Sequence, residues 1–539
     1  MRHRVMGANA PAFDLNGPRV APLPWIPMLL TLLLALPLLL SAGHGLTAAL
    51  AAAFQWGADG PANPLWPGLR TQAMLLRGVG LGVLSAWLAT ALGAAVAVAL
   101  LLPMARRWRI VLGALLAASF CFGSVVHLMA WRTLFPGING GTGGWALAVL
   151  TLGGRYAPLC AALFAAGLMS LDRAELEAAL FTGGAPALWA VAKGRLLRLA
   201  GMSLAAVGAL TFSETELPPL LGVHIYAQEF MSLVALEASP GAAAAQGWPL
   251  MAVALACGGL LAGLPRLRAG SGSGQATGWL AAWVFAPALL RCVAWPLALT
   301  MAVLPLALLA VGTWQATGRW QAVPWPMLQQ TLLNTLWVAT AASAAACLWS
   351  WALAAWAVRA GRSATTALHL LLPTLMLWPS SLTGLAVLAL ASSAFSPVLD
   401  LFDATALVTA HVLRILPFTA WLMLAMREAE PLAPREQLAV LGASTWGALR
   451  HVHAPAALPR LAAAFLLGLG LSLAELTATV LTVPPGMETV ILRLYNLLHY
   501  GDQRGVMTLA LLQGLAVAML VGVSLVGASG WETRRHAGN

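Results

Sequence analysis

The chain has 539 residues, 60% of them apolar and only 9% charged, and its mean hydropathy is +0.83. Charged residues make up about a quarter of a typical soluble domain. The composition therefore excludes an ordinary soluble enzyme and predicts an all-α polytopic membrane protein. The net charge of +11 is explained by basic residues retained in cytoplasmic loops, so no nucleic-acid partner is expected.

Apolar runs of bilayer-spanning length follow one another along the first half of the chain. A basic cytoplasmic N-terminus, residues 1–24, precedes a first transmembrane domain predicted at 25–265. The predicted spans of this domain lie near residues 25–40, 73–102, 110–131, 145–170, 198–220 and 247–264.

A predicted cytoplasmic linker, residues 266–292, begins with a flexible Gly-Ser-Gly-Ser-Gly stretch. Its apolar part, 279–290, is interpreted as an interfacial lead-in because it is too short to span. A second transmembrane domain is predicted at 293–530 and a cytoplasmic tail at 531–539. The predicted spans of the second domain lie near residues 293–313, 331–357, 365–390, 404–426, 457–481 and 506–529.

This arrangement gives about twelve transmembrane helices, with both termini in the cytoplasm. It leaves twenty Lys and Arg residues on the cytoplasmic side and five outside. Because positive residues concentrate on the cytoplasmic side of membrane proteins, the count favours this orientation over its inverse.

The two halves share residues at a constant offset of 259 positions. The matched pairs are Arg155 and Arg414, Pro158 and Pro417, Glu177 and Glu436, Gly183 and Gly442, and Glu216 and Glu475. Matches in register over about sixty positions indicate an internal duplication. We therefore predict two homologous six-helix halves.

The matched polar segments predict a helix, a tight turn and a second helix in each half. In the second copy a short helix from Glu436 is expected to stop at Gly442, because glycine adopts left-handed conformations without strain. Ser444 suits the N-cap of the helix that follows. In the first copy Gly183 is expected to make the turn, and Pro186 falls at the first helical position.

These segments resemble the EAA loop of permease subunits in binding-protein-dependent ABC importers, the cytoplasmic hairpin that docks into the ATPase. The first copy has Glu177-Ala178-Ala179 and Gly183, with Leu196 where the family has proline. The second has Glu436, Gly442-Ala443 and Pro455, with Gln437-Leu438 in place of the alanines. The resemblance makes these residues ATPase-coupling loops.

The same resemblance implies the membrane subunit of a bacterial ABC importer, multi-pass in the inner (cytoplasmic) membrane. Its expected partners are two copies of an ATPase subunit, a periplasmic solute-binding protein and the lipid bilayer. The chain itself has no P-loop, because its only lysine, Lys193, is followed by Gly194. We therefore expect no enzymatic activity and no cofactor in this chain.

Two other classes of protein share some of these features. An ion-driven secondary transporter would also have duplicated spans and buried carboxylates, but it does not need paired polar hairpins on one side. A membrane enzyme would need a convergent catalytic set, which the sequence lacks.

Charged side chains also occur within the predicted spans. Glu214, Glu216 and Glu475 lie in the fifth and eleventh spans, and Arg155 and Arg414 in the spans before them. A carboxylate in a membrane span is costly and normally faces a cavity or a partner. One interpretation places these residues in the transport pathway or its gate. The other pairs Glu216 with Arg155 and Glu475 with Arg414, and the two are compatible.

Neither the histidines nor the cysteines indicate a metal site. His127, His369 and His411 stand alone in predicted spans and are interpreted as packing residues. The five cysteines show no paired spacing, so no disulfide framework or thiolate site is implied.

The segment 474–496 resembles fused ferric-iron permeases, whose near relatives carry thiamine or phosphonates. Thr477 stands where that family usually has proline. Desolvated carboxylates repel anions, so Glu216 and Glu475 favour a cationic solute. We expect ferric iron first and thiamine second, with phosphonate, polyamine or another solute as the alternative.

Overall fold

The computed structural model describes residues 69–169, 171, 173–236, 240–262, 288–317, 325–391, 404–428, 454–500 and 503–537. Every regular element in these ranges is a helix. The predicted first span, most of the linker and the second polar loop, 429–453, lie outside the described residues. The domain limits given above therefore remain predictions.

The helices of the first half are α2 (Leu69–Leu101), α3 (Arg106–Cys121), α4 (Ser124–Leu134), α5 (Gly141–Met169), α6 (Arg173–Phe212), α7 (Leu217–Leu220), α8 (Tyr226–Leu236), α9 (Pro240–Gln246) and α10 (Trp248–Ala262). Those of the second half are α12 (Ala288–Thr317), α13 (Trp325–Ala360), α14 (Arg362–Met376), α15 (Ser380–Ala391), α17 (Thr405–Glu428), α20 (Ala454–Leu473), α21 (Thr477–Thr482), α22 (Val490–Tyr500) and α23 (Gln503–Ala537).

Helix ends recur at the offset found in the sequence. Helix α2 ends at Leu101 and α13 at Ala360, and α5 ends at Met169 and α17 at Glu428. Each pair of ends is separated by the 259 positions that relate the motifs. The two halves thus follow the same order of helices and breaks.

Seven described helices are long and apolar enough to cross a membrane, or nine if each of two bent pairs counts as one span. Two further apolar helices, α10 and part of α20, are shorter. This is the construction of a multi-pass membrane protein. The predicted total of twelve includes residues outside the described ranges and stays a prediction.

Two predicted spans are bent rather than straight. The run 110–131 is divided into α3 and α4, and the run 365–390 into α14 and α15, each pair bent by 100°. Gly123 is extended between the first pair, and Pro379 precedes α15 in the second. Proline has no N–H for a helical hydrogen bond, so it interrupts the second run.

The fifth and eleventh predicted spans also stop early. Helix α6 ends at Phe212 and α20 at Leu473, and the short helices α7 and α21 follow after breaks. Pro218 and Pro219 favour a new helix start at α7, where missing N–H groups cost nothing. Glu216 and Glu475 therefore lie at helix breaks and not inside continuous spans.

The two halves pack against each other through two equivalent helix pairs. The last helix of the first half, α10, packs on α14 of the second, and α23 of the second half packs on α3 of the first. The α10–α14 contact is close, since a Cβ added at Gly258 would lie 2.3 Å from Oγ1 of Thr374. Helix α12 belongs to the second half by sequence, yet it packs on α2, α3 and α4 of the first.

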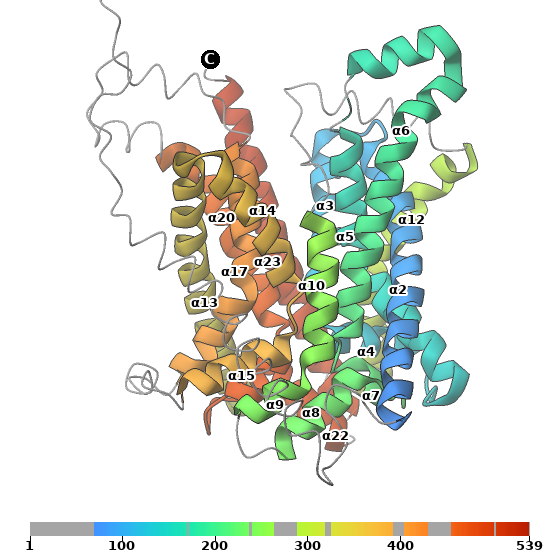
Figure 1. The fold of residues 1–539 in the computed structure, drawn as a ribbon. Coiled ribbons are helices and arrows are strands. Elements are labelled where there is room, and N and C mark those ends of the chain that lie inside the picture. The colour runs from blue at the N-terminus through green and yellow to red at the C-terminus, as the bar shows by residue number, and fades with distance from the viewer. Residues whose placement is uncertain are drawn as a thin grey trace, which may run out of the picture.

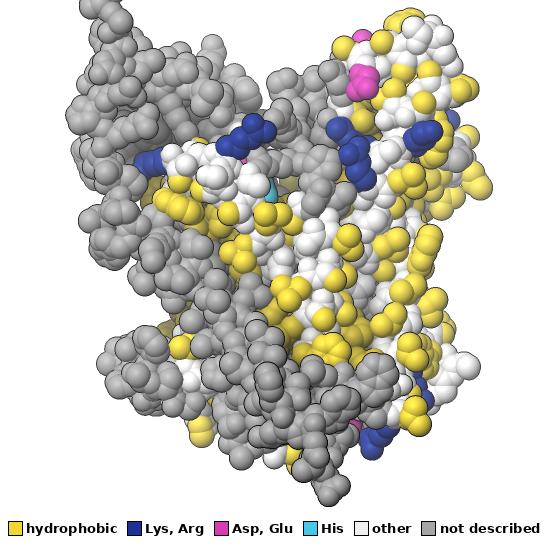
Figure 2. Space-filling view, in the orientation of Figure 1, with side chains coloured by type: hydrophobic (Ala, Val, Ile, Leu, Met, Phe, Trp, Pro, Cys, Tyr) yellow, Lys and Arg dark blue, Asp and Glu magenta, His cyan; other side chains and the backbone are white. Residues whose placement is uncertain are grey.

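The two ends of the helical bundle differ (Figure 1). The start of α6 extends beyond the bundle at one end and folds back, whereas α7, α8, α9, α15 and α22 lie towards the other end. Apolar side chains cover much of the middle of the described surface in Figure 2, and Lys and Arg gather nearer its ends. Exposed apolar residues such as Leu76 and Trp87 suit contact with lipid.

Candidate functional site

The first polar loop forms a helical hairpin at the start of α6. A helix from Arg173 reaches Gly183, and the next helix starts at Pro186, as the sequence predicts. The hairpin rests on the bundle through Leu176, Ala179 and Leu188, which are buried in one apolar cluster with residues of α2 and α3. Glu177 is half-buried and Ala178 is exposed.

The residue that turns the hairpin is Gly184, one position after the predicted Gly183. Gly184 has φ 60° and ψ −145°, a conformation that is almost restricted to glycine. Gly183 serves a different purpose, because a Cβ there would lie 2.8 Å from Cβ of Ala187. Gly183 thus permits close approach of the two helices, and Gly184 permits the turn.

The tip of the hairpin exposes large apolar side chains. Phe181 is 87% exposed and Trp189 is 54% exposed. Apolar side chains that are exposed close together are candidates for contact with another molecule. The second copy of this loop, with Glu436, Gly442 and Ala443, lies outside the described residues, and so does the side chain of Pro455.

The buried charged residues meet where α6 and α20 break. In the first half, Nη1 of Arg155 lies 3.2 Å from Oε2 of Glu214. Ser124, the first residue of α4, donates to Oε1 of Glu214 at 3.0 Å and to Oε2 of Glu216 at 2.9 Å in alternative hydroxyl orientations. The backbone N–H of Glu216 also donates to Glu214, at 3.2 Å.

In the second half, Nε of Arg414 lies 3.3 Å from Oε2 of Glu475. Nη1 of the same arginine donates to the carbonyl oxygens of Met376 and Trp378, at 3.2 Å and 3.0 Å. These carbonyls belong to the bend between α14 and α15. Arg414 therefore joins that bend to the break between α20 and α21.

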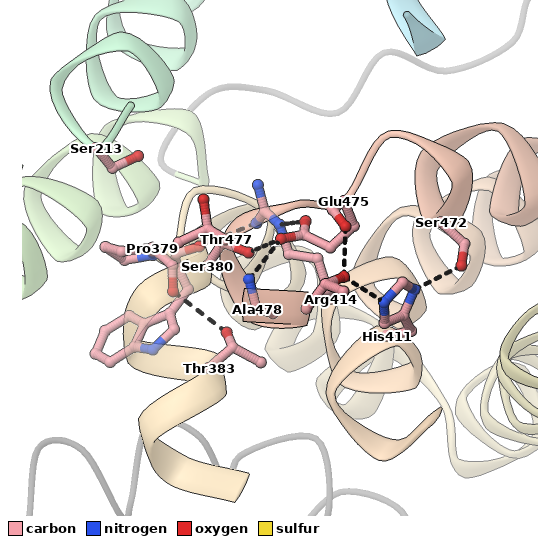
Figure 3. Close-up of polar contacts among 12 residues, drawn as sticks. Ser213, Pro379, Ser380, Thr383, His411, Arg414, Ser472, Glu475, Thr477 and Ala478 are labelled. Atoms are coloured by element: carbon pink, nitrogen blue, oxygen red, sulfur yellow. Dashed lines mark hydrogen bonds and ion pairs between the residues drawn. The ribbon is translucent and has the colours of Figure 1, made fainter. Parts of the chain in front are cut away.

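Glu475 is also held by donors of its own half (Figure 3). Ser380, the first residue of α15, donates to Oε1 of Glu475. The backbone N–H of Ala478 donates to the same oxygen at 3.0 Å, so the carboxylate caps the start of α21. His411 lies alongside, with Nδ1 2.6 Å from Oγ of Ser472 and Nε2 2.9 Å from Oγ1 of Thr479.

The two breaks touch each other across the boundary between the halves. Oγ1 of Thr215 lies 2.8 Å from Oγ1 of Thr477, and Thr477 donates to Oε1 of Glu216 at 3.2 Å. We call this group of five side chains the seam. Its members are Glu214, Thr215, Glu216, Glu475 and Thr477.

The pairing predicted from the duplication is right in one half and wrong in the other. Arg414 pairs with Glu475 as expected, but Arg155 pairs with Glu214 and not with Glu216. Among the described residues, Glu216 has hydroxyl and no ion-pair partners. The offset misleads here because the first half has a second acid, Glu214, where the second half has Leu473.

Several seam partners were not identified from the sequence. Ser124 and Ser380 each begin the helix after a bend, a position where Ser is common and could have drawn attention. Thr215 had no distinguishing signal. The sequence distinguishes Thr477 only by its departure from the proline of the resembled family.

Other polar residues that the sequence singles out have local partners. His127 contacts the carbonyl of Ser119 at 2.8 Å, and His369 lies 3.0 Å from Glu428. In the segment 474–496, Glu488 is bound by Arg493 at 2.7 Å and by Asn496 at 3.2 Å. Within the described part of the chain, no three His, Cys, Asp or Glu residues form a group that could hold a metal ion.

Comparison with known proteins gives a partial similarity to transport permeases. A 62-residue segment, 12% of the chain, is 44% identical to a putative 2-aminoethylphosphonate transport system permease protein, PhnV, of Salmonella paratyphi A. PhnV proteins of Salmonella typhimurium and Salmonella typhi are 42% identical over 62 residues. The matched segment covers 23% of the first two relatives and 24% of the third. No protein-family profile matches the chain, and no solved structure matches it.

Proposed function

We propose that this chain is the membrane permease subunit of a bacterial ATP-driven ABC importer, with two fused transmembrane domains. The observation that carries the proposal is the α6 hairpin. It extends beyond the bundle (Figure 1), exposes Phe181 at its tip, and has a sequence twin at Glu436 and Gly442. Two such loops suit docking to two ATPase subunits, and the partial similarity to a transport permease supports the same class.

In this proposal the hairpins face the cytoplasm of a cell with an inner membrane, and both chain termini lie on that side. A periplasmic solute-binding protein delivers the solute to the opposite end. ATP binding closes the ATPase dimer, the hairpins move with it, and the halves reorient around the seam. A cysteine placed in the linker at 270–274 should then be labelled only from the cytoplasm. Labelling of the linker from the periplasm would reverse this orientation.

The hairpin assignment is tested by placing a charge on its exposed tip. We expect Phe181→Glu to lower ATPase co-purification and uptake strongly, because the exposed ring would lie in the partner contact. Leu236→Glu is the matched control for ATPase capture, since Leu236 is 82% exposed in α8, towards the opposite end of the bundle. Full ATPase capture and uptake by Phe181→Glu would reject the docking role.

The second loop is tested separately. Gly442→Val is expected to insert normally and to abolish transport by straining the turn predicted there. Glu436→Ala should weaken ATPase capture. Full uptake by both variants would remove the second loop from the proposal.

The solute we propose carries a positive group. The seam holds three carboxyl groups beside the two guanidinium groups of Arg155 and Arg414. Among the described residues Glu216 thus has no guanidinium of its own, and a carboxyl group in a poorly solvated site can bind a cation. Ferric iron and thiamine satisfy this condition. So does an aminoalkylphosphonate, the kind of solute named for the PhnV relatives, through its ammonium group.

Competition uptake decides among these solutes. Cells carrying the whole transport system would be given labelled iron, thiamine or 2-aminoethylphosphonate, each with the others as competitors. Glu216→Gln should lower uptake of the true cationic solute. Uptake of a solute without a positive group, unchanged by Glu216→Gln, would reject the substrate class.

An ion-driven secondary transporter remains the rival class. Purified protein in liposomes, without an ATPase partner, would then accumulate solute when an ion gradient is imposed. We expect no such accumulation until ATPase and ATP are supplied.

A further inference from the structure

The hydroxyl of Thr477 joins the two halves of the molecule. It donates to Glu216 at 3.2 Å, and a hydroxyl has one proton to donate and two lone pairs to accept. The 2.8 Å contact with Thr215 is therefore completed by the proton of Thr215. One side chain of the second half thus accepts from one residue of the first half and donates to another.

This contact is poorly accessible to water. Thr215 is 9% exposed and Thr477 is 7% exposed. When the contact separates, the two hydroxyls and Glu216 need water or new partners, because buried polar groups without partners are unfavourable. The contact is therefore favourable while water is excluded from the seam, and hydrogen bonds to water can replace it once water enters. A contact that opens and closes needs both properties.

The two halves contribute unequally to the contact. The position equivalent to Thr477 in the first half is Pro218, whose side chain has no donor. Ser124 and Ser380 bond to carboxylates of their own halves. Thr482, in the same helix as Thr477, bonds to the carbonyl of Ala478 at 2.8 Å, within α21.

The location of the contact suits a gate. Thr215 lies in the break after α6 and Thr477 at the start of α21, beside the break after α20. Breaks let the short segments move without bending a whole helix. Helix α7 follows Glu216 directly and lies towards the end of the bundle opposite to the hairpin (Figure 1).

We propose that Thr477 is a latch residue, whose hydroxyl holds the two halves together at the end opposite the hairpin and is released when the pathway opens there. The latch rests on the proposed permease function. It predicts that ATP, acting on the hairpins, loosens a contact at the other end of the molecule.

Cysteine cross-linking tests the closed contact directly. The double variant Thr215→Cys, Thr477→Cys would be made in a chain lacking the five native cysteines, with a protease site in the linker at 270–274. The two hydroxyl oxygens are 2.8 Å apart, so sulfurs at these positions can approach disulfide distance. We expect an oxidised protein whose halves stay joined after proteolysis until a reductant is added. Thr215→Cys with Thr482→Cys is the control pair and should cross-link far more slowly.

The same variant tests release. With the ATPase subunits bound, a non-hydrolysable ATP analogue should slow cross-linking about tenfold, since release shifts the balance from closed to open. The cross-linked protein should lose uptake and regain it on reduction. Failure to cross-link, equal rates with and without nucleotide, or full uptake by the cross-linked protein would each overturn the latch.

The hydroxyl itself is tested by Thr477→Val, with Thr477→Ser as the conservative variant and Thr482→Val as the control. Loss of two buried hydrogen bonds should favour the open state about tenfold and raise ATPase activity in the absence of binding protein. Thr477→Ser should behave as the wild type, and equal behaviour of the Val and Ser variants would overturn the role of the hydroxyl. If the wild-type chain captures no ATPase, the permease proposal fails, while cross-linking without nucleotide still reports whether the contact is closed.

Discussion

The arginines Arg155 and Arg414 have different partners near the helix breaks of the two halves. In the second half Arg414 binds Glu475 and two carbonyls of the neighbouring bend. In the first half the ion pair of Arg155 among the described residues is with Glu214, and its guanidinium lies over the ring of Tyr156. The carbonyl of Ser119, near the end of α3, is contacted by His127 instead. A duplicated scaffold can therefore keep its helix order while its polar contacts diverge.

The different partners of the two arginines affect the seam. Because Glu214 takes the guanidinium of Arg155, Glu216 is available to a hydroxyl of the other half. Its twin, Glu475, remains bound within its own half. In the Glu216–Thr477 hydrogen bond the first half thus supplies the acceptor and the second half the donor.

The largest effect is expected from removing the arginine with more partners. Arg414→Leu leaves a poorly exposed carboxylate without its cation and should cost about 3–5 kcal/mol of stability. Arg155→Leu should cost less, because it removes one ion pair and no carbonyl contacts. Thermal unfolding in detergent measures both. Adding Glu475→Leu to Arg414→Leu should recover part of the loss, and no recovery would contradict the ion-pair explanation.

A smaller effect is expected when the first hairpin receives the residue of the second. Gly184→Ala places at the turn the residue found at the twin position, Ala443. Because the φ of Gly184 is 60°, the change should cost about 2 kcal/mol locally and reduce ATPase capture.

Gly183→Ala separates the turn from helix packing. Its Cβ would meet that of Ala187 at 2.8 Å, so Ala187→Gly should relieve the defect of Gly183→Ala but not that of Gly184→Ala. Relief of both, measured as ATPase capture, would show that the turn is not set by Gly184.

Replacing the buried glutamates Glu214 and Glu475 should lower the stability of the protein by different amounts. Glu214→Leu installs the residue of the second half, Leu473, and leaves Arg155 with Glu216 as its nearest replacement partner. Glu475→Leu leaves Arg414 bound to the carbonyls of Met376 and Trp378 without its carboxylate. We expect Glu475→Leu to be the more destabilising by about 1.5 kcal/mol, the scale of a hydrogen bond to a charged group. Equal melting temperatures would contradict the difference between the halves.

The smallest effect is expected at His411. His411→Leu installs the first-half residue, Leu152, and removes contacts with Ser472 and Thr479. Thr479 keeps the carbonyl of Glu475 at 2.5 Å, so the cost should be about 1 kcal/mol. Thermal unfolding beside a His369→Leu control measures this cost. A loss of stability as large as that of Arg414→Leu would contradict the small contribution expected of His411.

The sequence by itself determined the membrane class and the duplication. Composition and hydropathy depend on each residue alone, and the 259-residue offset is a property of the order of residues. The start of the second hairpin helix at Pro186 was predictable for the same reason, because proline fixes its own backbone and lacks an N–H. Local chemistry suffices for such features.

Only the tertiary structure decided the partners. Glu214 and Glu216 are only two residues apart in the sequence, but they lie in different places. Which of them binds Arg155 depends on where α6 ends and on how closely α4 approaches. Helix α12 follows the linker, yet it packs on the other half, because apolar helices pack wherever complementary surface is available. The turn at Gly184 and the contact of Thr477 with Thr215 arise in the same way, since close packing and distances between halves are set by the whole bundle.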